Sequence, residues 1–343
     1  MLADQDSLIQ RLAGEVNEQR QHRRSFVLVS SGAIALGSQR LGYAKRPTEV
    51  ARLQAAAAAG QSVLMRRYDE AFAALGMTAA QVLLTHADLA ERDRMNNARN
   101  AFAALLDAGA VPIVNENDTV STEELRFGDN DQLAAMVAPL VDADLLVLLT
   151  DVDGVMDERG DRISVMADGQ SIGTVAPSSA RVGTGGIASK IDAARKGSRS
   201  GADVVIAPAS RVGVLGDILS GKEVGTLFPR AGSPLRARHH WIAFTLRPRG
   251  ALLLDDGAVK AVTSGRVSLL PVGVLGVRGA FGAGDPVRLM APDGREIGRG
   301  LARLSAPDAA RAAGKKGDEL AVELGPGFSD QVLVHKDDLV LSD

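Results

Sequence analysis

The sequence predicts an α/β fold, with a mostly parallel sheet that carries helices on both faces and a small β-rich domain at the C-terminal end. Short apolar runs, typical of strands covered on both faces, alternate with segments whose apolar residues recur at helical spacing. Beyond about residue 245 the sequence pattern changes to short β-like runs with frequent glycine. We therefore expect two domains, residues 1–244 and 245–343, which agrees with a length of 343 residues.

The overall composition excludes several classes of protein. Hydrophobic residues make up 45% and charged residues 24%, the balance of a soluble globular protein. A net charge of -3 gives no support for broad attraction to nucleic acid or anionic membranes. The absence of cysteine removes disulfides, thiolate metal sites and cysteine nucleophiles. With no bilayer-length apolar segment and no signal peptide, we expect a cytoplasmic protein with no membrane partner.

The alternation can be followed along the chain. Helical spacing predicts helices at 7–20, 47–75, 93–108, 131–141, 191–199 and 212–219. Apolar runs predict strands at 25–30, 78–84, 110–114, 144–149 and 202–207. In the second domain strands are expected at 284–290 and 331–335, and Asp293-Gly294 predicts a hairpin into 296–301. Residues 236–241 are interpreted as a linker or packing hinge, and the adjacent His239 and His240 are not read as metal ligands.

The strongest candidate site lies at 114–131, where a strand ends. It contains Asn115-Glu116-Asn117-Asp118 and then Gly128-Asp129-Asn130-Asp131, just before an Ala-rich helix. In open α/β sheets, ligands bind beyond the carboxyl ends of the strands. A loop and a helix cap need only one such polar residue, so the excess of carboxylates and amides favours a binding site.

Three other strand-to-helix junctions are candidates. Small residues at 30–33 let a ligand approach the backbone, although an ordinary tight turn explains them equally well. Thr150 and Asp151 follow a buried strand and could contact a nucleotide or organise a metal-bound phosphate. The Gly-rich segment 182–190 precedes a helix and carries Lys190, which favours phosphate binding, but it lacks the spacing of a Walker P-loop.

Taken in order, these motifs closely resemble those of the glutamate 5-kinases, a branch of the amino acid kinase family. They are Ser-Ser-Gly-Ala at 30–33, Asn-Glu-Asn-Asp at 115–118, Gly-Asp-Asn-Asp at 128–131, Leu-Leu-Thr-Asp at 148–151 and Gly-Thr-Gly-Gly-x-x-x-Lys at 183–190. The resemblance continues through 238–242, and the tail, including 334–338, resembles a PUA domain. It implies an amino acid kinase-like three-layer sandwich followed by a PUA-like domain.

The resemblance implies ATP- and Mg²⁺-dependent phosphorylation of the γ-carboxylate of L-glutamate to L-glutamyl 5-phosphate, the first step of proline biosynthesis. Carried over by position, the glutamate-binding residues would be Ser31, Asp118, Asp129 and Asn130. The ATP-binding residues would be Thr150, Asp151, Thr184, Gly185, Gly186, Ile187, Ala188, Ser189 and Lys190. Lys190 would neutralise charge on the transferring phosphoryl group and Asp131 would orient lysines, so these two are the catalytic candidates. No metal-ligating residue is assigned.

The resemblance also implies a homo-oligomer (dimer or tetramer), channelling of the product to glutamyl phosphate reductase, and feedback inhibition by proline. Two alternatives stay open. The chain could be another kinase of the family, acting on aspartate, acetylglutamate, carbamate or a nucleoside monophosphate. It could also be a remnant kinase fold with an RNA-binding or regulatory role through the PUA-like tail, although no dense basic stripe supports RNA binding.

One departure from the family pattern concerns the start of the chain. Family members begin with a strand ending in Lys-x-Gly-Ser/Thr, whose lysine and glycine contact ATP phosphates, and Met1-Leu2-Ala3-Asp4 aligns just past it. Either the start site was assigned too late or the protein is a truncated, impaired copy. We expect the 343-residue chain to be a poor kinase and an extended form to be active, because losing a charge-stabilising group slows phosphoryl transfer by orders of magnitude. Normal hydroxamate formation by the short chain would contradict this expectation.

Overall fold

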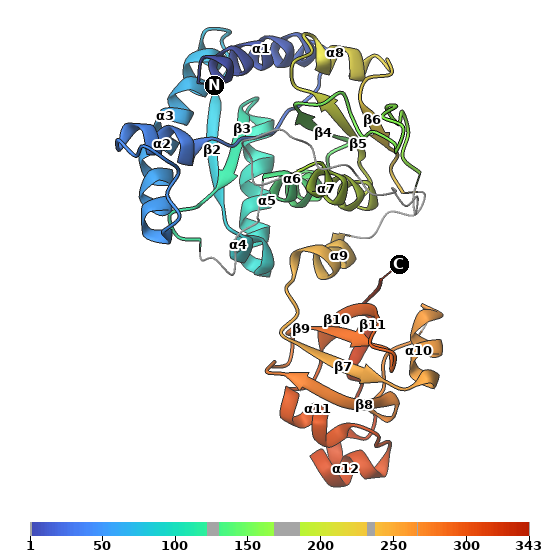
Figure 1. The fold of residues 1–343 in the computed structure, drawn as a ribbon. Coiled ribbons are helices and arrows are strands. Elements are labelled where there is room, and N and C mark those ends of the chain that lie inside the picture. Colours follow the sequence, from blue (N-terminus) through green and yellow to red (C-terminus); the bar gives the residue numbers. More distant parts are fainter. Residues whose placement is uncertain (1, 122–129, 168–185, 232–236, 266, 343) are drawn as a thin grey trace. The chain divides into compact units, whose positions relative to one another are not determined.

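The computed structural model describes residues 2–121, 130–167, 186–231, 237–265 and 267–342 (Figure 1). Contacts within the chain divide it into two units, Met1–Pro234 and Leu235–Asp343. The domain limits expected from the sequence, 1–244 and 245–343, stay a prediction, because a division by contacts does not test independent folding. In the part of the chain that the structure describes, no helix is long and apolar enough to cross a membrane.

The strands that the structure describes in the first unit form two three-stranded groups. One has the order β1-β3-β2, all parallel, from β1 (Leu28–Val29), β2 (Ala79–Leu84) and β3 (Val111–Glu116). The other has the order β4-β5-β6, from β4 (Leu145–Thr150), β5 (Asp203–Pro208) and β6 (Thr226–Phe228). β4 and β5 are parallel and only β6 runs antiparallel to its neighbour. The mostly parallel α/β class predicted from the apolar runs is confirmed.

Helices separate the strands along the chain, as the alternating pattern predicts. They are α1 (Leu2–Arg20), α2 (Ala33–Arg40), α3 (Val50–Ala73), α4 (His86–Ala90), α5 (Arg92–Asp107), α6 (Asn130–Val137), α7 (Ile187–Arg199) and α8 (Val214–Leu219). A 3₁₀ turn, Ala138–Leu140, follows α6, so the helix expected at 131–141 ends early at a segment containing Pro139.

The side chains of each strand alternate between two helical layers. On β5, Val205 packs with α1, α3 and α8, whereas its neighbours Val204 and Ile206 pack with α6 and α7. On β3, Ile113 joins the first layer and Val114 the second, where it meets Phe102 of α5. Figure 1 shows α1 and α8 on one side of these strands and α6 and α7 on the other. The first layer draws on strands of both groups, so the two groups share one core.

The closest helix packing joins α2 to α3. A Cβ at Gly37 would lie 1.7 Å from the carbonyl oxygen of Ala56, and a Cβ at Gly60 would lie 1.8 Å from that of Ala33. The two helices therefore touch through their backbones, which only glycine permits at these positions. The Ala-rich segment 55–59, interpreted from the sequence as a packing surface, supplies one side of this contact.

A buried carboxylate on α1 caps α8. Glu15, 6% exposed, accepts hydrogen bonds from the backbone N–H of Gly213 at 2.9 Å and of Leu215 at 2.8 Å. The first N–H groups of a helix have no intrahelical partner, and a negative charge there is favoured by the helix dipole. Arg11, one turn earlier on α1, also donates to the carbonyl of Ala209. α1 thus fixes the loop that follows β5.

The second unit is built on a five-stranded sheet in the order β11-β10-β9-β7-β8. Its strands are β7 (Gly250–Leu254), β8 (Val274–Gly279), β9 (Pro286–Met290), β10 (Glu296–Ala302) and β11 (Val334–Leu341). β9 and β10 pair antiparallel, which confirms the hairpin predicted at Asp293-Gly294. The sequence did not predict the helices α10 (Asp256–Thr263), α11 (Ala306–Ala312) and α12 (Asp318–Leu324), which are short.

The described part of the segment interpreted as a linker, from residue 237 on, is helical. α9 (Ala237–His240) continues into a π-helical turn, Trp241–Thr245. Nε2 of His239 lies 3.1 Å from the carbonyl oxygen of Asp337, and the ring of His240 packs on Phe244 with centroids 4.9 Å apart. Both histidines therefore have structural contacts within the second unit.

Gly60→Ala should destabilise the protein by about 3 kcal/mol, because the new methyl group would overlap the backbone of α2. Gly14→Ala is the matched control: it also lies inside a helix, and no described atom beyond its own stretch of helix lies within 4 Å of the position that its new methyl group would take. The control should be neutral or more stable by about 0.5–1 kcal/mol. Urea unfolding of both variants measures the difference, and equal effects would contradict the backbone contact.

Acid should weaken the connection between β5 and the segment after β6. Arg230 hydrogen-bonds the Asp203 carboxylate at 2.8 Å and holds its pKa below the usual value, against the opposing effect of burial. A pKa lowered in the folded state stabilises the fold above the unfolded-state pKa of about 4, and this contribution is lost as the pH falls through the folded-state value. Because both groups are partly exposed, it should amount to less than about 1 kcal/mol.

The measurement is urea unfolding of Asp203→Asn and the unaltered protein between about pH 2.5 and 5. The variant should lose less stability on acidification than the unaltered protein does. Asp69→Asn, at an exposed position on α3, is the control for replacing a surface carboxylate elsewhere in the first unit. Parallel pH curves for Asp203→Asn and the unaltered protein would contradict the assignment.

Candidate functional site

Four polar junctions lie at the carboxyl ends of parallel strands. β1 leads through residues 30–32 into α2, and β3 ends at Glu116 before the turn at 117–120. β4 ends at Thr150, and β5 ends at Pro208. Within each group the parallel pairing places these ends at the same edge. This is where ligands bind in open α/β folds.

The turn after β1 presents its backbone at the start of α2. Gly32 has a φ of 108°, a left-handed conformation that favours glycine, and it precedes the first residue of α2. Ser31 is exposed, and its carbonyl oxygen accepts a hydrogen bond of 3.1 Å from Gln5 of α1. The backbone N–H of Ser30 extends the β1–β3 ladder by donating to Val114 at 2.8 Å. This hydrogen bond therefore fixes the start of the turn to β3.

Asn130, the first residue of α6, connects this turn to the end of β3. Its Nδ2 donates to the carbonyl oxygen of Ser30 and, at 3.2 Å, to Oδ1 of Asn115. Asn115 is 4% exposed, and its Oδ1 also accepts from the backbone N–H of Glu116 at 2.9 Å. The segments 30–33 and 115–118, which are separate candidates in the sequence, are thus connected through the side chain of Asn130.

The next residue of α6, Asp131, pairs with Lys190 of α7. Nζ of Lys190 lies 2.8 Å from Oδ1 and 3.0 Å from Oδ2 of Asp131, and each side chain is 15% exposed. α6 and α7 are further joined by Gln132, whose Nε2 donates to Asp192 at 2.9 Å. Asn130 and Asp131 are adjacent, so the amide contacts and the ion pair meet in the first turn of α6.

Thr150 and Asp151 stand at the end of β4. Thr150 is 6% exposed and its Oγ1 lies 3.3 Å from Oδ1 of Asp151, which is exposed. The carbonyl oxygen of Thr150 accepts from the N–H of Ala209 at 2.6 Å, in the loop that α1 fixes. A hydrogen bond therefore ties the end of β4 to the loop after β5, and the carboxylate of Asp151 faces solvent.

The remaining predicted residues can be placed only in part. Asp118 is half-buried in the turn after β3, and Lys190 lies in the first turn of α7. Gly186 precedes α7, and Ile187, Ala188 and Ser189 form its first residues. Asp129, Thr184 and Gly185 fall outside the described residues.

Two side chains of α3 reach the same junction, and sequence reasoning did not single them out. Oε1 of Gln61 accepts from Nδ2 of Asn115 at 2.9 Å, and Oη of Tyr68 donates to Oγ of Ser30 at 2.9 Å. Burial raises the pKa of the Tyr68 phenol, so the hydroxyl stays protonated and can donate. The sequence signal that could have indicated these two residues is weak: two polar side chains, seven residues apart, in an Ala-rich helix.

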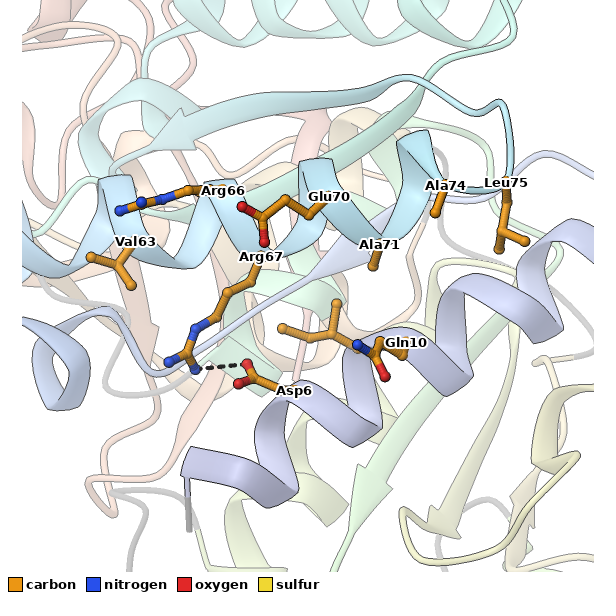
Figure 2. A pocket seen from close by; sticks show the side chains of 10 residues that line it. Asp6, Gln10, Val63, Arg66, Arg67, Glu70, Ala71, Ala74 and Leu75 are labelled. Atoms are coloured by element: carbon orange, nitrogen blue, oxygen red, sulfur yellow. Dashed lines mark ion pairs between the residues drawn. The ribbon is translucent and has the colours of Figure 1, made fainter.

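A cavity of about 640 Å³ lies elsewhere, between α1 and α3 (Figure 2). Asp6 and Arg67 form an ion pair of 2.9 Å at its wall, with Gln10, Arg66 and Glu70 nearby. None of the residues predicted from the sequence lines it. The volume of this cavity alone therefore does not make it the functional site, and the polar residues at the strand ends stay the candidates.

Comparison with known proteins assigns this arrangement to a family. The model of the amino acid kinase family matches residues 1–208, more than half of the chain. The chain belongs to the amino acid kinase family. A second family model, that of the PUA domain, matches residues 250–324 of this amino acid kinase.

Several curated relatives of this amino acid kinase are named glutamate 5-kinase. Glutamate 5-kinase of Streptomyces coelicolor is 48% identical over 326 residues, which are 93% of this chain and 86% of the relative. Glutamate 5-kinase of Trichlorobacter lovleyi is 45% identical over 341 residues, covering 97% of this chain and 90% of the relative. The glutamate 5-kinase of Thermus thermophilus is 44% identical, with 97% and 91% covered.

A solved structure supports the fold. N-acetylglutamate synthase from Neisseria gonorrhoeae superposes with a TM-score of 0.50 at 18% identity, covering 66% of this chain and 57% of that one. At this identity the likeness shows the fold alone. It agrees with the layered α/β arrangement of the amino acid kinase described above.

Proposed function

We propose that this chain transfers the γ-phosphoryl group of ATP to the γ-carboxylate of L-glutamate, giving L-glutamyl 5-phosphate and ADP, the first step of proline biosynthesis. The observation that carries the proposal is the Lys190–Asp131 pair beside Asn130 at the strand ends, in a chain whose relatives are glutamate 5-kinases. A cation beside a cluster of polar amide side chains suits a phosphoryl transfer to an anionic amino acid.

The reaction needs positioning and charge neutralisation more than proton transfer. A carboxylate is already a nucleophile, so its oxygen can form the new bond to the γ-phosphorus without a general base. The bond to the β–γ bridging oxygen breaks and ADP leaves with that oxygen. Lys190 would stabilise the negative charge on the transferring group, and Asp131 would hold the ammonium of Lys190 in place.

The substrates would occupy two ends of the site. Ser31, Asp118, Asp129 and Asn130 are proposed to bind glutamate, because their described members surround the ends of β1 and β3. Thr150, Asp151 and residues 184–190 are proposed to bind ATP at the end of β4 and the start of α7. The first turn of α6 lies where these two ends meet.

Mg²⁺ is proposed to enter with ATP. Among the described residues no group of three or more His, Cys, Asp or Glu side chains could hold a metal ion, and Asp131 is already paired with Lys190. In kinase sites Mg²⁺ is commonly held by substrate phosphates, water and only one or two carboxylates, so a cluster of three protein ligands is not required. Bound to the phosphates, the ion would neutralise part of their negative charge. The positive charge that this chain itself supplies would be that of Lys190.

Several broader properties are also proposals. We place the protein in the cytoplasm, as a dimer or tetramer that passes its product to glutamyl phosphate reductase. The acyl phosphate is unstable in water, which favours direct transfer to the next enzyme. Sedimentation of the purified chain, alone and with that reductase, would test assembly and transfer. RNA binding by the second unit is not proposed.

The function is tested by hydroxamate formation from ATP, hydroxylamine and each of a panel of acids: glutamate, aspartate, acetylglutamate and carbamate. Coupled ADP release with the same panel and with nucleoside monophosphates covers the other acceptors. Glutamate should give the highest kcat/KM. A clear preference for any other acceptor would overturn the assignment.

Lys190→Met should lower kcat by about 100-fold or more, because it removes a positive charge aimed at the developing negative charge. The KM for glutamate should change much less. Lys222→Met, which removes an exposed lysine paired with Asp217 on α8, is the control and should retain the full rate. A Lys190→Met protein with unchanged kcat would remove this residue from the mechanism.

A further inference from the structure

The amide of Asn130 is held in one orientation. Its Nδ2 faces two oxygen acceptors, the carbonyl of Ser30 and Oδ1 of Asn115. A backbone carbonyl can only accept, so the nitrogen must point toward Ser30. Both amide hydrogens are then donated within the protein. The other polar atom of this side chain, Oδ1, can only accept a hydrogen bond.

The orientation of Asn115 is fixed in the same way. Its Oδ1 accepts from the backbone N–H of Glu116, a group that can only donate, so Nδ2 must point the other way. There it donates to Oε1 of Gln61 at 2.9 Å. Gln61 therefore supports Asn115 in the orientation that Asn130 requires.

The other acceptor of Asn130 is supported from the same helix. Tyr68 is 6% exposed, and its Oη donates to Oγ of Ser30 at 2.9 Å in a buried setting. Ser30 also carries the carbonyl that accepts from Asn130, and it precedes Ser31 of the turn. Gln61 and Tyr68 are seven residues apart on α3, so they lie two turns apart on one face.

We propose that Gln61 and Tyr68 are positioning residues that orient the Asn130 amide, so that its Oδ1 selects the ammonium group of the amino-acid substrate. Gln61 acts through Asn115 and Tyr68 acts through Ser30. An ammonium donates to this oxygen, whereas a carboxylate at the same place would meet an acceptor and be repelled. This inference rests on the proposed function, because it assumes that glutamate is the ligand at this end.

The test begins with variants that remove single hydrogen-bonding groups. Tyr68→Phe deletes only the hydroxyl, and Gln61→Met keeps the size of the side chain but not its acceptor. Each should raise the KM for glutamate by about tenfold, because a buried partner is left unsatisfied, while the KM for ATP stays within about twofold. Equal increases in both KM values, or no increase, would overturn the proposal.

Matched controls separate positioning from general damage. Tyr43→Phe changes the one other tyrosine of the chain, in the connection between α2 and α3, and Gln81→Met changes an exposed glutamine on β2. Both should leave the KM for glutamate unchanged. Gln61→Glu restores an acceptor for Asn115 and should have a lower KM for glutamate than Gln61→Met. No rescue by Gln61→Glu would contradict the role of that oxygen.

A double-mutant cycle tests whether the α3 residues act through Asn130. In an Asn130→Ala background, Tyr68→Phe and Gln61→Met should have little further effect on the KM for glutamate. Fully additive effects would show that they stabilise the fold without orienting the amide. If Tyr68→Phe does not fold, the Gln61 series supports or overturns the proposal by the same criteria.

Calorimetric titration of glutamate without ATP keeps this inference distinct from the proposed function. If the unaltered protein binds glutamate and the two variants bind it equally well, the positioning role fails and the function stands. If the unaltered protein binds glutamate but transfers no phosphoryl group, the function fails while about tenfold weaker binding by the variants still supports the positioning role. A protein that binds no glutamate overturns both.

Discussion

The backbone contact between α2 and α3 is the constraint on which the polar junction of β1, β3 and α6 depends. Gly37 and Gly60 let the two helices approach until each glycine faces a carbonyl oxygen of its neighbour. This approach brings α3 within hydrogen-bonding reach of the turn before α2 and of the end of β3. A side chain at either glycine would push α3 outward, and the supports of Ser30 and Asn115 would move with it.

The first turn of α6 divides the site into two chemical halves. Asn130 belongs to a network of neutral amides, hydroxyls and backbone groups, whereas Asp131 belongs to an ion pair with Lys190. The amide half is suited to recognising shape and hydrogen-bond direction, and the charged half to responding to phosphate. Because the two residues are adjacent on α6, any shift of this helix moves the hydrogen bonds of Asn130 and the ion pair of Asp131 together.

The sequence predicted the strand-to-helix junctions well, because each is marked by a local change from apolar to small or polar residues. It could not show which junctions touch. Gln61 and Asn115 are 54 residues apart and Tyr68 and Ser30 are 38 apart, and helical spacing defines a face without saying which loop that face meets. Strand length was also poorly predicted: the run expected at 25–30 forms only Leu28–Val29, since pairing with β3 decides where a ladder ends. The short helices α10 to α12 lay in segments with too few residues to display a helical period.

The cap that α1 provides for α8 also bears on the order in which the first unit folds. Glu15 bonds to residues 198 and 200 positions further along the chain, so the loop it closes is nearly as long as the unit itself. During synthesis α1 can form early and Glu15 can pair with Arg11 of the same helix, but the backbone N–H groups that Glu15 caps exist only once residues 213 and 215 have been made. Contacts of such long sequence separation slow folding and leave apolar surface exposed meanwhile. The contacts of α1 within the first unit are therefore completed only after α8 has been made.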